Sequence, residues 1–255
     1  MKLKLRSVEF EYPSISVLKN ISFELNSQET LAIVGKNGAG KSTLIKCINR
    51  ILEYEKGKIL LDEQEVAKMK RKDIAKRIAY LPQKSSYTFP IVVFDVVLMG
   101  RYPHLSGGNN KENEKRVWEI LKILNLESLA LRNFGEISAG QQQKVLIARA
   151  IVQEADLLLF DEPTSNLDLR HQLEVMEIIK KIVREKSISA IVAIHDLNLA
   201  ARYSDNAIML NNGVIFALGT PFSVFTSENI AEVYGVEALV TEKEGIPNII
   251  PQRPI

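Results

Sequence analysis

Long apolar runs and paired cysteines are both missing from this sequence. The one cysteine, Cys47, cannot form an internal disulfide, and nothing in the composition points to secretion. No apolar run approaches the ~20 residues needed to span a bilayer, since even the segment 91–99 is short and is broken by Asp95. Residues 1–6 alternate charge with leucine, unlike a signal peptide. If the protein works at a membrane, we expect another chain to span it.

An excess of one charge sign is missing as well. The chain has 33 Lys and Arg against 31 Asp and Glu, a net charge of +2, so its electrostatics give no reason to expect nucleic acid as the main partner. The hydrophobic fraction of 46% and the charged fraction of 25% are ordinary for a globular protein and exclude disordered and fibrous classes. A length of 255 residues suits one large domain, or one domain with a sizeable insertion.

Apolar periodicity predicts an α/β fold with a mainly parallel sheet. The run 31–34, Leu-Ala-Ile-Val, is wholly apolar, which is typical of a strand buried on both faces. Helical stretches at 42–52 and 170–186 fall between strands, and this alternation favours a parallel core. Early strands without intervening helices indicate an antiparallel β addition at the N-terminus. The other strands are expected at 3–5, 8–12, 21–25, 58–61, 78–81, 157–160, 188–194, 207–210 and 214–217.

The middle of the chain has a different pattern, of helices joined by loops. One helix is expected over 111–124, with Val117 and Leu121 on its apolar face, after a Gly-rich flexible loop at 107–110. We therefore expect a helical subdomain inserted into the α/β core. The expected units are a core of 1–84 and 153–225, a helical subdomain of 85–152, and a C-terminal part of 226–255 with a helix near 227–234 and a Pro-rich tail.

The strongest motif follows the buried strand. Residues Gly35 to Ser42 fit G-x-x-x-x-G-K-[ST] without exception and lie between a strand and a helix, the context that this motif requires. Glycines permit backbone conformations that turn N–H groups toward phosphate oxygens, and the helix N-terminus adds its dipole. Lys41 supplies charge for the β- and γ-phosphates, and Ser42 supplies a hydroxyl for Mg²⁺. A Gly-rich turn that matches by chance is disfavoured by that context.

A second motif ends another apolar strand. Residues 157–160 are followed by two adjacent carboxylates, Asp161 and Glu162. Asp161 can hold Mg²⁺ through water as a Walker-B acid does, and Glu162 is a candidate general base that polarises the attacking water. An Asp-Glu pair before Pro163 would be an ordinary turn by itself, but the P-loop upstream favours the catalytic interpretation.

A third motif distinguishes among P-loop proteins. Residues 137–142, Ile-Ser-Ala-Gly-Gln-Gln, open a helix in which Ser138 is a good N-cap and Gly140 leaves room for close approach. The segment resembles the signature of the ATP-binding subunit of ABC transporters, which is usually Leu-Ser-Gly-Gly-Gln. Ile137 and Ala139 depart from that pattern. The extra methyl group of Ala139 should be tolerated, because the contact atoms are the serine hydroxyl and backbone N–H groups.

The resemblance extends over nearly the whole chain. Gln83 matches the family's Q-loop glutamine, Asp168 its D-loop, His195 its switch histidine, and Tyr12 lies where the family places an aromatic that stacks on adenine. Each could be an ordinary structural residue by itself, but all occur in the family's order. The implied catalytic residues are Glu162, His195, Lys41 and Gln83. The implied ATP contacts are Tyr12, Gly35, Asn37, Gly38, Ala39, Gly40, Lys41, Ser42, Thr43, Ser138, Gly140, Gln141 and Asp168, and the implied Mg²⁺ ligands are Ser42, Gln83 and Asp161.

The resemblance also implies partners. Two copies of such a subunit close head to tail around two ATP molecules, so that the P-loop of one copy faces Ser138, Gly140 and Gln141 of the other, while Asp168 links the two sites. The family works at the cytoplasmic face of the membrane on integral permease subunits, and indirectly with an extracytoplasmic substrate-binding protein. No nucleic-acid partner is expected.

The segment 89–104 narrows the class. It resembles the importers of metal chelates, namely iron–siderophore, haem and cobalamin systems, in which a stretch ending in Gly-Arg-Tyr-Pro lies near the membrane partner. Val92, Val96 and Met99 could form an apolar face that receives a helix of that partner, although packing within the subdomain is the commoner use of such spacing.

Other interpretations remain open at this point. The basic run 68–77 could bind acidic lipid or nucleic acid, but the solvated face of a short helix with Ile74 and Ile78 turned inward is favoured. A soluble ABC-type ATPase of DNA repair or translation usually has a long coiled-coil insertion or two ATPase units, and neither is present. A P-loop kinase leaves 138–142 and His195 unexplained. An importer of molybdate or tungstate is a further alternative.

Overall fold

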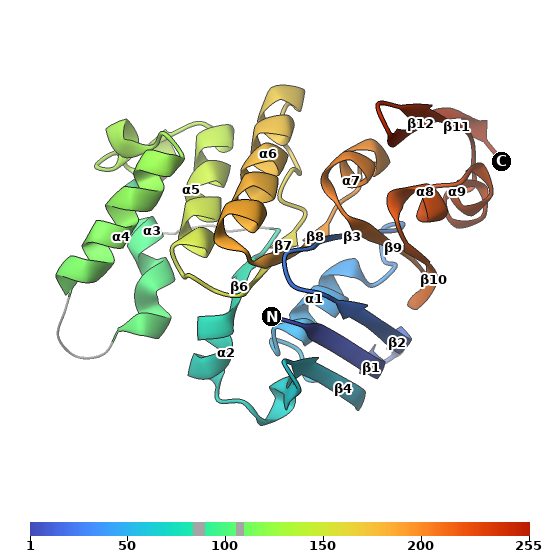
Figure 1. Ribbon diagram of the computed structural model, residues 1–255, viewed down its shortest axis with the longest axis horizontal. Coiled ribbons are helices and arrows are strands. Elements are labelled where there is room, and N and C mark those ends of the chain that lie inside the picture. The colour runs from blue at the N-terminus through green and yellow to red at the C-terminus, as the bar shows by residue number, and fades with distance from the viewer. Residues whose placement is uncertain (84–89, 106–109) are drawn as a thin grey trace.

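The computed structural model describes residues 1–83, 90–105 and 110–255, and a parallel sheet lies at its centre (Figure 1). This sheet has the strand order β10-β9-β3-β8-β7-β6, in which the strands from β9 to β6 pair in parallel and β10 pairs antiparallel to β9. All residues of β3, β7 and β8 are buried, as expected for central strands covered on both faces. The strands are β3 (Thr30–Val34), β6 (Ile78–Leu81), β7 (Leu157–Asp161), β8 (Ser189–Ala193), β9 (Asn206–Asn211) and β10 (Val214–Gly219).

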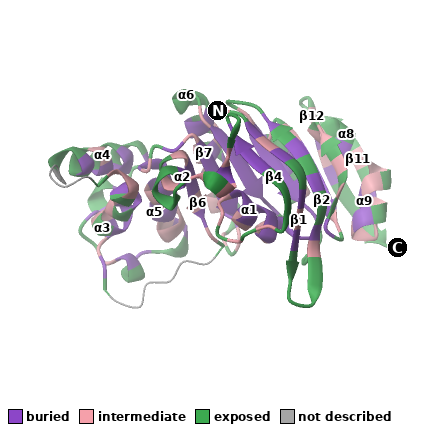
Figure 2. Ribbon diagram, turned by 90° about the horizontal axis from the view of Figure 1, so that it is seen from below, coloured by how far each residue is buried: buried purple, intermediate pink, exposed green. Residues whose placement is uncertain are grey.

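The expected antiparallel addition is a second sheet of order β2-β1-β4-β5. Its central strand pairs on both sides, with Leu3 opposite Leu25 on one neighbour and opposite Leu61 on the other. Alternate residues of this sheet are buried against α1 (Lys41–Ile48), which therefore lies between the two sheets (Figure 2). The strands are β1 (Leu3–Tyr12), β2 (Ile15–Leu25), β4 (Lys56–Leu61) and β5 (Gln64–Glu65).

Helices cover the opposite face of the central sheet and form one end of the molecule (Figure 1). α6 (Leu169–Lys186) and α7 (Leu197–Tyr203) pack on that face, and α3 (Val93–Leu98), α4 (Asn110–Ile123) and α5 (Ala139–Ile151) form the helical end. The helix expected over 111–124 is confirmed as α4, whereas the loop expected over 107–110 falls largely outside the described residues. Short 3₁₀ turns lie at Val66–Lys68, Met99–His104, Glu127–Leu129 and Phe134–Glu136.

Two expectations about surfaces can now be compared with burial. Val96 is fully buried on α3, which agrees with packing within the subdomain and removes it from the possible docking face, while Met99 keeps 43% of its surface exposed. The basic run contributes α2 (Arg71–Arg77), in which Ile74 is buried while most of the charged residues are exposed, as expected for a solvated helix face. Among the helices of the described residues, none is long and apolar enough to cross a bilayer.

Two other expectations are corrected by the backbone. α1 ends at Ile48 rather than near residue 52, because Arg50 adopts a left-handed φ of 52° that a helix cannot continue. The expected Pro-rich tail is instead a two-stranded sheet of β11 (Val236–Lys243) and β12 (Ile246–Pro254), which follows α8 (Pro221–Val224) and α9 (Ser227–Tyr234). Prolines are tolerated there because each strand is paired on only one side.

Candidate functional site

The phosphate-binding loop leaves the end of β3 and enters α1. Gly35 requires glycine, since its φ is +147° and a Cβ would lie 2.4 Å from the Leu210 carbonyl oxygen. Gly40 has φ +104° and is the residue just before α1. The Lys41 side chain folds back over the loop, and its Nζ donates to the carbonyl oxygens of Gly35 at 2.9 Å and Lys36 at 3.1 Å. The ammonium group thus lies on the inner side of the loop.

Charge around the loop is concentrated at the end of β7. Burial lowers the pKa of Lys41, and the nearby carboxylates Glu162 and Asp161 act in the opposite direction. Burial has the opposite effect on an acid and raises the pKa of Asp161. The Asp161 Oδ1 accepts a hydrogen bond from the Ser42 hydroxyl at 2.7 Å. The Tyr80 hydroxyl approaches the other oxygen of Asp161 at 3.5 Å. The site therefore holds a buried cation beside a buried carboxylate that has few hydrogen bonds of its own.

The Ser42–Asp161 pair fits a Mg²⁺ site in its chemistry, because Mg²⁺ prefers oxygen ligands and commonly takes one or two from protein. Within the described residues, no three His, Cys, Asp or Glu side chains group closely enough to bind a metal by themselves. A metal ion at this place would thus depend on phosphate oxygens and water for its remaining ligands.

The Glu162 side chain contacts residues that follow the two strands beside β7, Gln83 and His195. Glu162 has a left-handed φ of 55° and is only 9% exposed. Its Oε1 lies 2.5 Å from His195 Nε2, and its Oε2 accepts a hydrogen bond from the Gln83 amide. Gln83 follows β6 and His195 follows β8, so the three side chains meet because the carboxyl ends of adjacent parallel strands share one edge of the sheet.

A cavity of about 560 Å³ opens above these groups. Tyr12 is 41% exposed at its rim, and its ring packs edge-to-face on Phe10 with 4.9 Å between ring centroids, so one face of the tyrosine is available for stacking. Ile15 and Val17 add an apolar wall that we had not anticipated from sequence. The lining residues are Tyr12, Ile15, Val17, Asn37, Gly38, Gly40, Lys41, Ser42, Thr43, Gln83, Glu162 and His195. Gly35 and Ala39, two of the predicted ATP contacts, are not among the lining residues, and Ala39 is buried.

The signature segment does not line this cavity. Ser138 caps α5 reciprocally, since its Oγ accepts from the Gln141 N–H at 3.3 Å and its own N–H donates to Gln141 Oε1 at 3.0 Å. Gly140 is required by packing, because a Cβ would lie 2.3 Å from the His171 ring. The helix N-terminus is thus formed and exposed, but at a place that the P-loop of the same chain does not reach.

Asp168 also lies outside the cavity. It is the N-cap of α6, accepts from the His171 N–H at 2.9 Å and pairs with His171 Nδ1 at 2.8 Å. These bonds from His171 hold the pKa of Asp168 below its usual range. Asp168 therefore has a local structural role in the single chain, and any role in a second site needs a partner copy.

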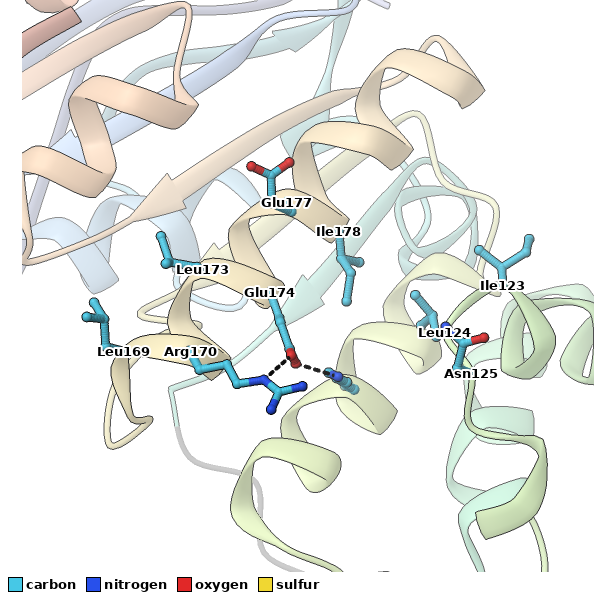
Figure 3. A pocket seen from close by; sticks show the side chains of 10 residues that line it. Ile123, Leu124, Asn125, Leu169, Arg170, Leu173, Glu174, Glu177 and Ile178 are labelled. Atoms are coloured by element: carbon cyan, nitrogen blue, oxygen red, sulfur yellow. Dashed lines mark hydrogen bonds and ion pairs between the residues drawn. The ribbon is translucent and has the colours of Figure 1, made fainter. Parts of the chain in front are cut away.

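A second cavity, of about 850 Å³, lies between the helical end and α6 (Figure 3). Its wall carries apolar side chains such as Leu173 and Ile178 around an ion-pair network. Glu174 forms an ion pair with Lys144 Nζ at 2.6 Å and accepts a hydrogen bond from Arg170 Nε at 2.9 Å. Among the described residues, those that line this cavity include none of those that line the P-loop cavity, so the two cavities are distinct.

These features define a P-loop ATPase, and comparison with known proteins identifies the family. Residues 18–165 match the ABC transporter family, to which the chain belongs as an ATP-binding, ATP-hydrolysing subunit. An uncharacterised ABC transporter ATP-binding protein of Methanocaldococcus jannaschii is 48% identical over 98% of both chains. The ferric enterobactin transport ATP-binding protein of Escherichia coli is 33% identical over 98% of this chain and 94% of its own. The hemin import ATP-binding protein of Thermobifida fusca is 34% identical over 98% and 89%.

Solved structures agree with this assignment. A protein described as a metal-chelate type ABC transporter, in an inward-facing conformation, superposes with a TM-score of 0.86 and 29% identity over 98% of this chain and 97% of its own. A dimeric ATP-binding cassette in a post-hydrolysis state, bound to ADP and phosphate, superposes with a TM-score of 0.76 and 27% identity over 86% and 98%. The predicted α/β P-loop core with a mixed sheet and inserted helices is confirmed.

Proposed function

We propose that this chain is the ATP-hydrolysing subunit of an importer of metal chelates, such as an iron–siderophore or haem complex. Relatives named for ferric enterobactin transport and for hemin import align with 98% of the chain, and a metal-chelate type transporter aligns with the same share. In this proposal the chain lies at the cytoplasmic face of the membrane, bound to integral permease subunits that receive substrate from an extracytoplasmic binding protein.

The meeting of Gln83, Glu162 and His195 beside the P-loop is the observation that carries the catalytic part of this proposal. Backbone N–H groups of the loop and Lys41 bind the phosphates, and Tyr12 stacks on the base. When bound, Mg²⁺ offsets phosphate charge, with Ser42, Asp161 and Gln83 as its proposed holders. Glu162 exchanges its contacts with Gln83 and His195 for the attacking water, orients that water and accepts its proton.

His195 has the complementary role at the γ-phosphate. Once Glu162 turns to the water, the His195 ring is free to donate to a phosphate oxygen and to stabilise the charge that develops there. The ring is half-exposed at the mouth of the cavity, within reach of such a ligand.

A second copy completes the site in this proposal. Ser138, Gly140 and Gln141 offer a capped helix N-terminus that the chain's own P-loop does not contact, and such a terminus suits a phosphate. A related cassette bound to ADP and phosphate is a dimer, which supports the pairing of two copies. In the proposed pair the copies lie head to tail, with Asp168 near the junction. Loss of γ-phosphate contacts after hydrolysis would then allow the pair to open and move the permease.

The test is capture and transport by the assembled system. The tagged chain should isolate integral permease subunits from detergent-solubilised membranes, and the reconstituted complex should hydrolyse ATP faster when a loaded binding protein is added. A metal chelate on that binding protein supports the substrate class, whereas molybdate or tungstate would replace it. Isolation of nucleic acid in place of a permease would instead favour the soluble ATPase of repair or translation.

A further inference from the structure

The position of His195 depends on a short helix. His195 lies in the connection between β8 and α7, directly before the N-cap Asp196. Asp196 Oδ1 accepts from the N–H groups of Asn198 at 2.8 Å and Leu199 at 3.0 Å, so the connection and the first turn of α7 form one rigid unit. With seven residues, α7 is too short to be held by its own hydrogen bonds, and its place is set by what it packs against.

The C-terminal hairpin is one of these neighbours, and the side chain of Asn198 connects α7 to it by hydrogen bonds. Asn198 Nδ2 donates to the Ile249 carbonyl oxygen at 3.0 Å, and Asn198 Oδ1 accepts from the Ile249 N–H at 2.8 Å. The amide thus satisfies both backbone groups of one residue of β12, 51 residues further along the chain. The rest of Ile249 is buried, so the strand cannot shift without breaking apolar contacts as well.

The hairpin is in turn anchored beside the P-loop. β11 begins two residues after Tyr234, whose hydroxyl oxygen is buried. Burial raises the pKa of Tyr234 to about 12. A Cβ on the next residue, Gly235, would lie 4.0 Å from the Lys36 Nζ of the P-loop. The segment that leads into the hairpin thus lies beside the P-loop.

We propose that the hairpin β11–β12 is a positioning element of the ATPase centre and that Asn198 is the positioning residue through which it fixes His195. This inference rests on the proposed function, since His195 matters only if it binds the γ-phosphate. The hairpin holds α7 through Asn198, α7 holds the connection through Asp196, and the connection presents the His195 ring to Glu162. A small displacement of a reacting group is costly in catalysis.

The test substitutes Asn198 with alanine in the full chain. We expect kcat for phosphate release to fall roughly tenfold, while ADP affinity is unchanged because ADP lacks the γ-phosphate that His195 contacts. The preference for ATP over ADP, measured by equilibrium binding, should fall by the same factor as in His195→Ala. In the double variant the two losses should not add, because both act through one ring.

Gln252→Ala is the matched control. Gln252 lies on the same strand, and its Nε2 donates to the Ile250 carbonyl oxygen of that strand at 3.3 Å rather than to α7. This control should keep the parent kcat and nucleotide preference. Parent values in Asn198→Ala, or losses that add fully to those of His195→Ala, would overturn the inference and leave the proposed function standing. A parent chain that releases no phosphate would overturn both.

Discussion

Replacing Glu162 with glutamine should separate ATP binding from ATP hydrolysis. Glutamine has nearly the same shape, and its carbonyl oxygen can still accept from His195 Nε2, which lies 2.5 Å from the carboxylate. In the parent, the Gln83 amide N–H donates to the other carboxylate oxygen of Glu162. In the variant, the Gln83 amide can rotate so that its oxygen accepts from the N–H of the introduced glutamine. The substitution therefore keeps the arrangement of the site but removes the charge and the basicity of the side chain.

The loss of rate follows from that removal. General acid–base catalysis contributes about 10²–10⁴-fold, so the barrier to hydrolysis should rise by about 3–5 kcal/mol. ATP affinity should be kept or increased, since Lys41 and Ser42 are untouched and one negative charge near the phosphates is gone. Single-turnover phosphate release measures the rate, and light scattering with ATP should detect an accumulated dimer.

Glu185→Gln provides the control, because Glu185 lies exposed near the end of α6 and pairs with Lys181, away from the residues that line the cavity. That variant should hydrolyse ATP at the parent rate. Phosphate release by Glu162→Gln at the parent rate would refute the role assigned to this carboxylate, and a loss of ATP binding would refute the claim that the substitution preserves the site.

Three further outcomes can be measured on the isolated chain. Asp161→Asn should raise the Tm of the nucleotide-free chain, and the gain should grow from about pH 4 to pH 7. Burial raises the pKa of Asp161 above its usual 3.8, so ionisation of the carboxyl destabilises the parent fold as pH rises through the folded-state pKa, and asparagine avoids this cost. An unchanged Tm would contradict this. Cys47 is fully buried and burial raises its thiol pKa to about 12, so a thiol reagent should label only opened chains. ATP at about 100 times Kd should then slow labelling about 100-fold if opening is global, and equal rates with and without ATP would contradict that. Gly140→Ala should cost about 1–3 kcal/mol by collision with His171, and His171→Ala should rescue much of the loss; absence of rescue assigns the cost elsewhere.

Much of the site could be predicted because its residues are tied to local pattern. A strand such as 31–34 must be apolar throughout to be covered on both faces, and a phosphate loop needs glycine where the backbone turns, as at Gly35. Asp161 and Glu162 then follow from their place at the end of a second apolar strand. Patterns of this kind can be recognised in the sequence alone, because each depends on residues that are neighbours in the chain.

Contacts between distant segments were not visible in this way. Asn198 gave no signal, since its partner Ile249 lies 51 residues away and a polar residue on a short helix is unremarkable. The C-terminal hairpin was not predicted, because proline cannot donate to a strand ladder and a Pro-rich segment therefore does not have the pattern of a strand. Glu244 and Gly245, both with positive φ, form a turn whose Gly was the available signal. For Val96 the sequence left a core face and a docking face both open, because apolar spacing does not distinguish them; burial decides for the core.

Phosphate release by the purified chain, alone and joined to its permease, tests the central claim most directly when it is compared with Lys41→Ala. The parent should bind ATP and release phosphate, and the variant should lose most ATP affinity, since Lys41 supplies the buried ammonium of the loop. A parent that neither retains ATP nor releases phosphate, or a variant that binds ATP as tightly as the parent, would contradict the account.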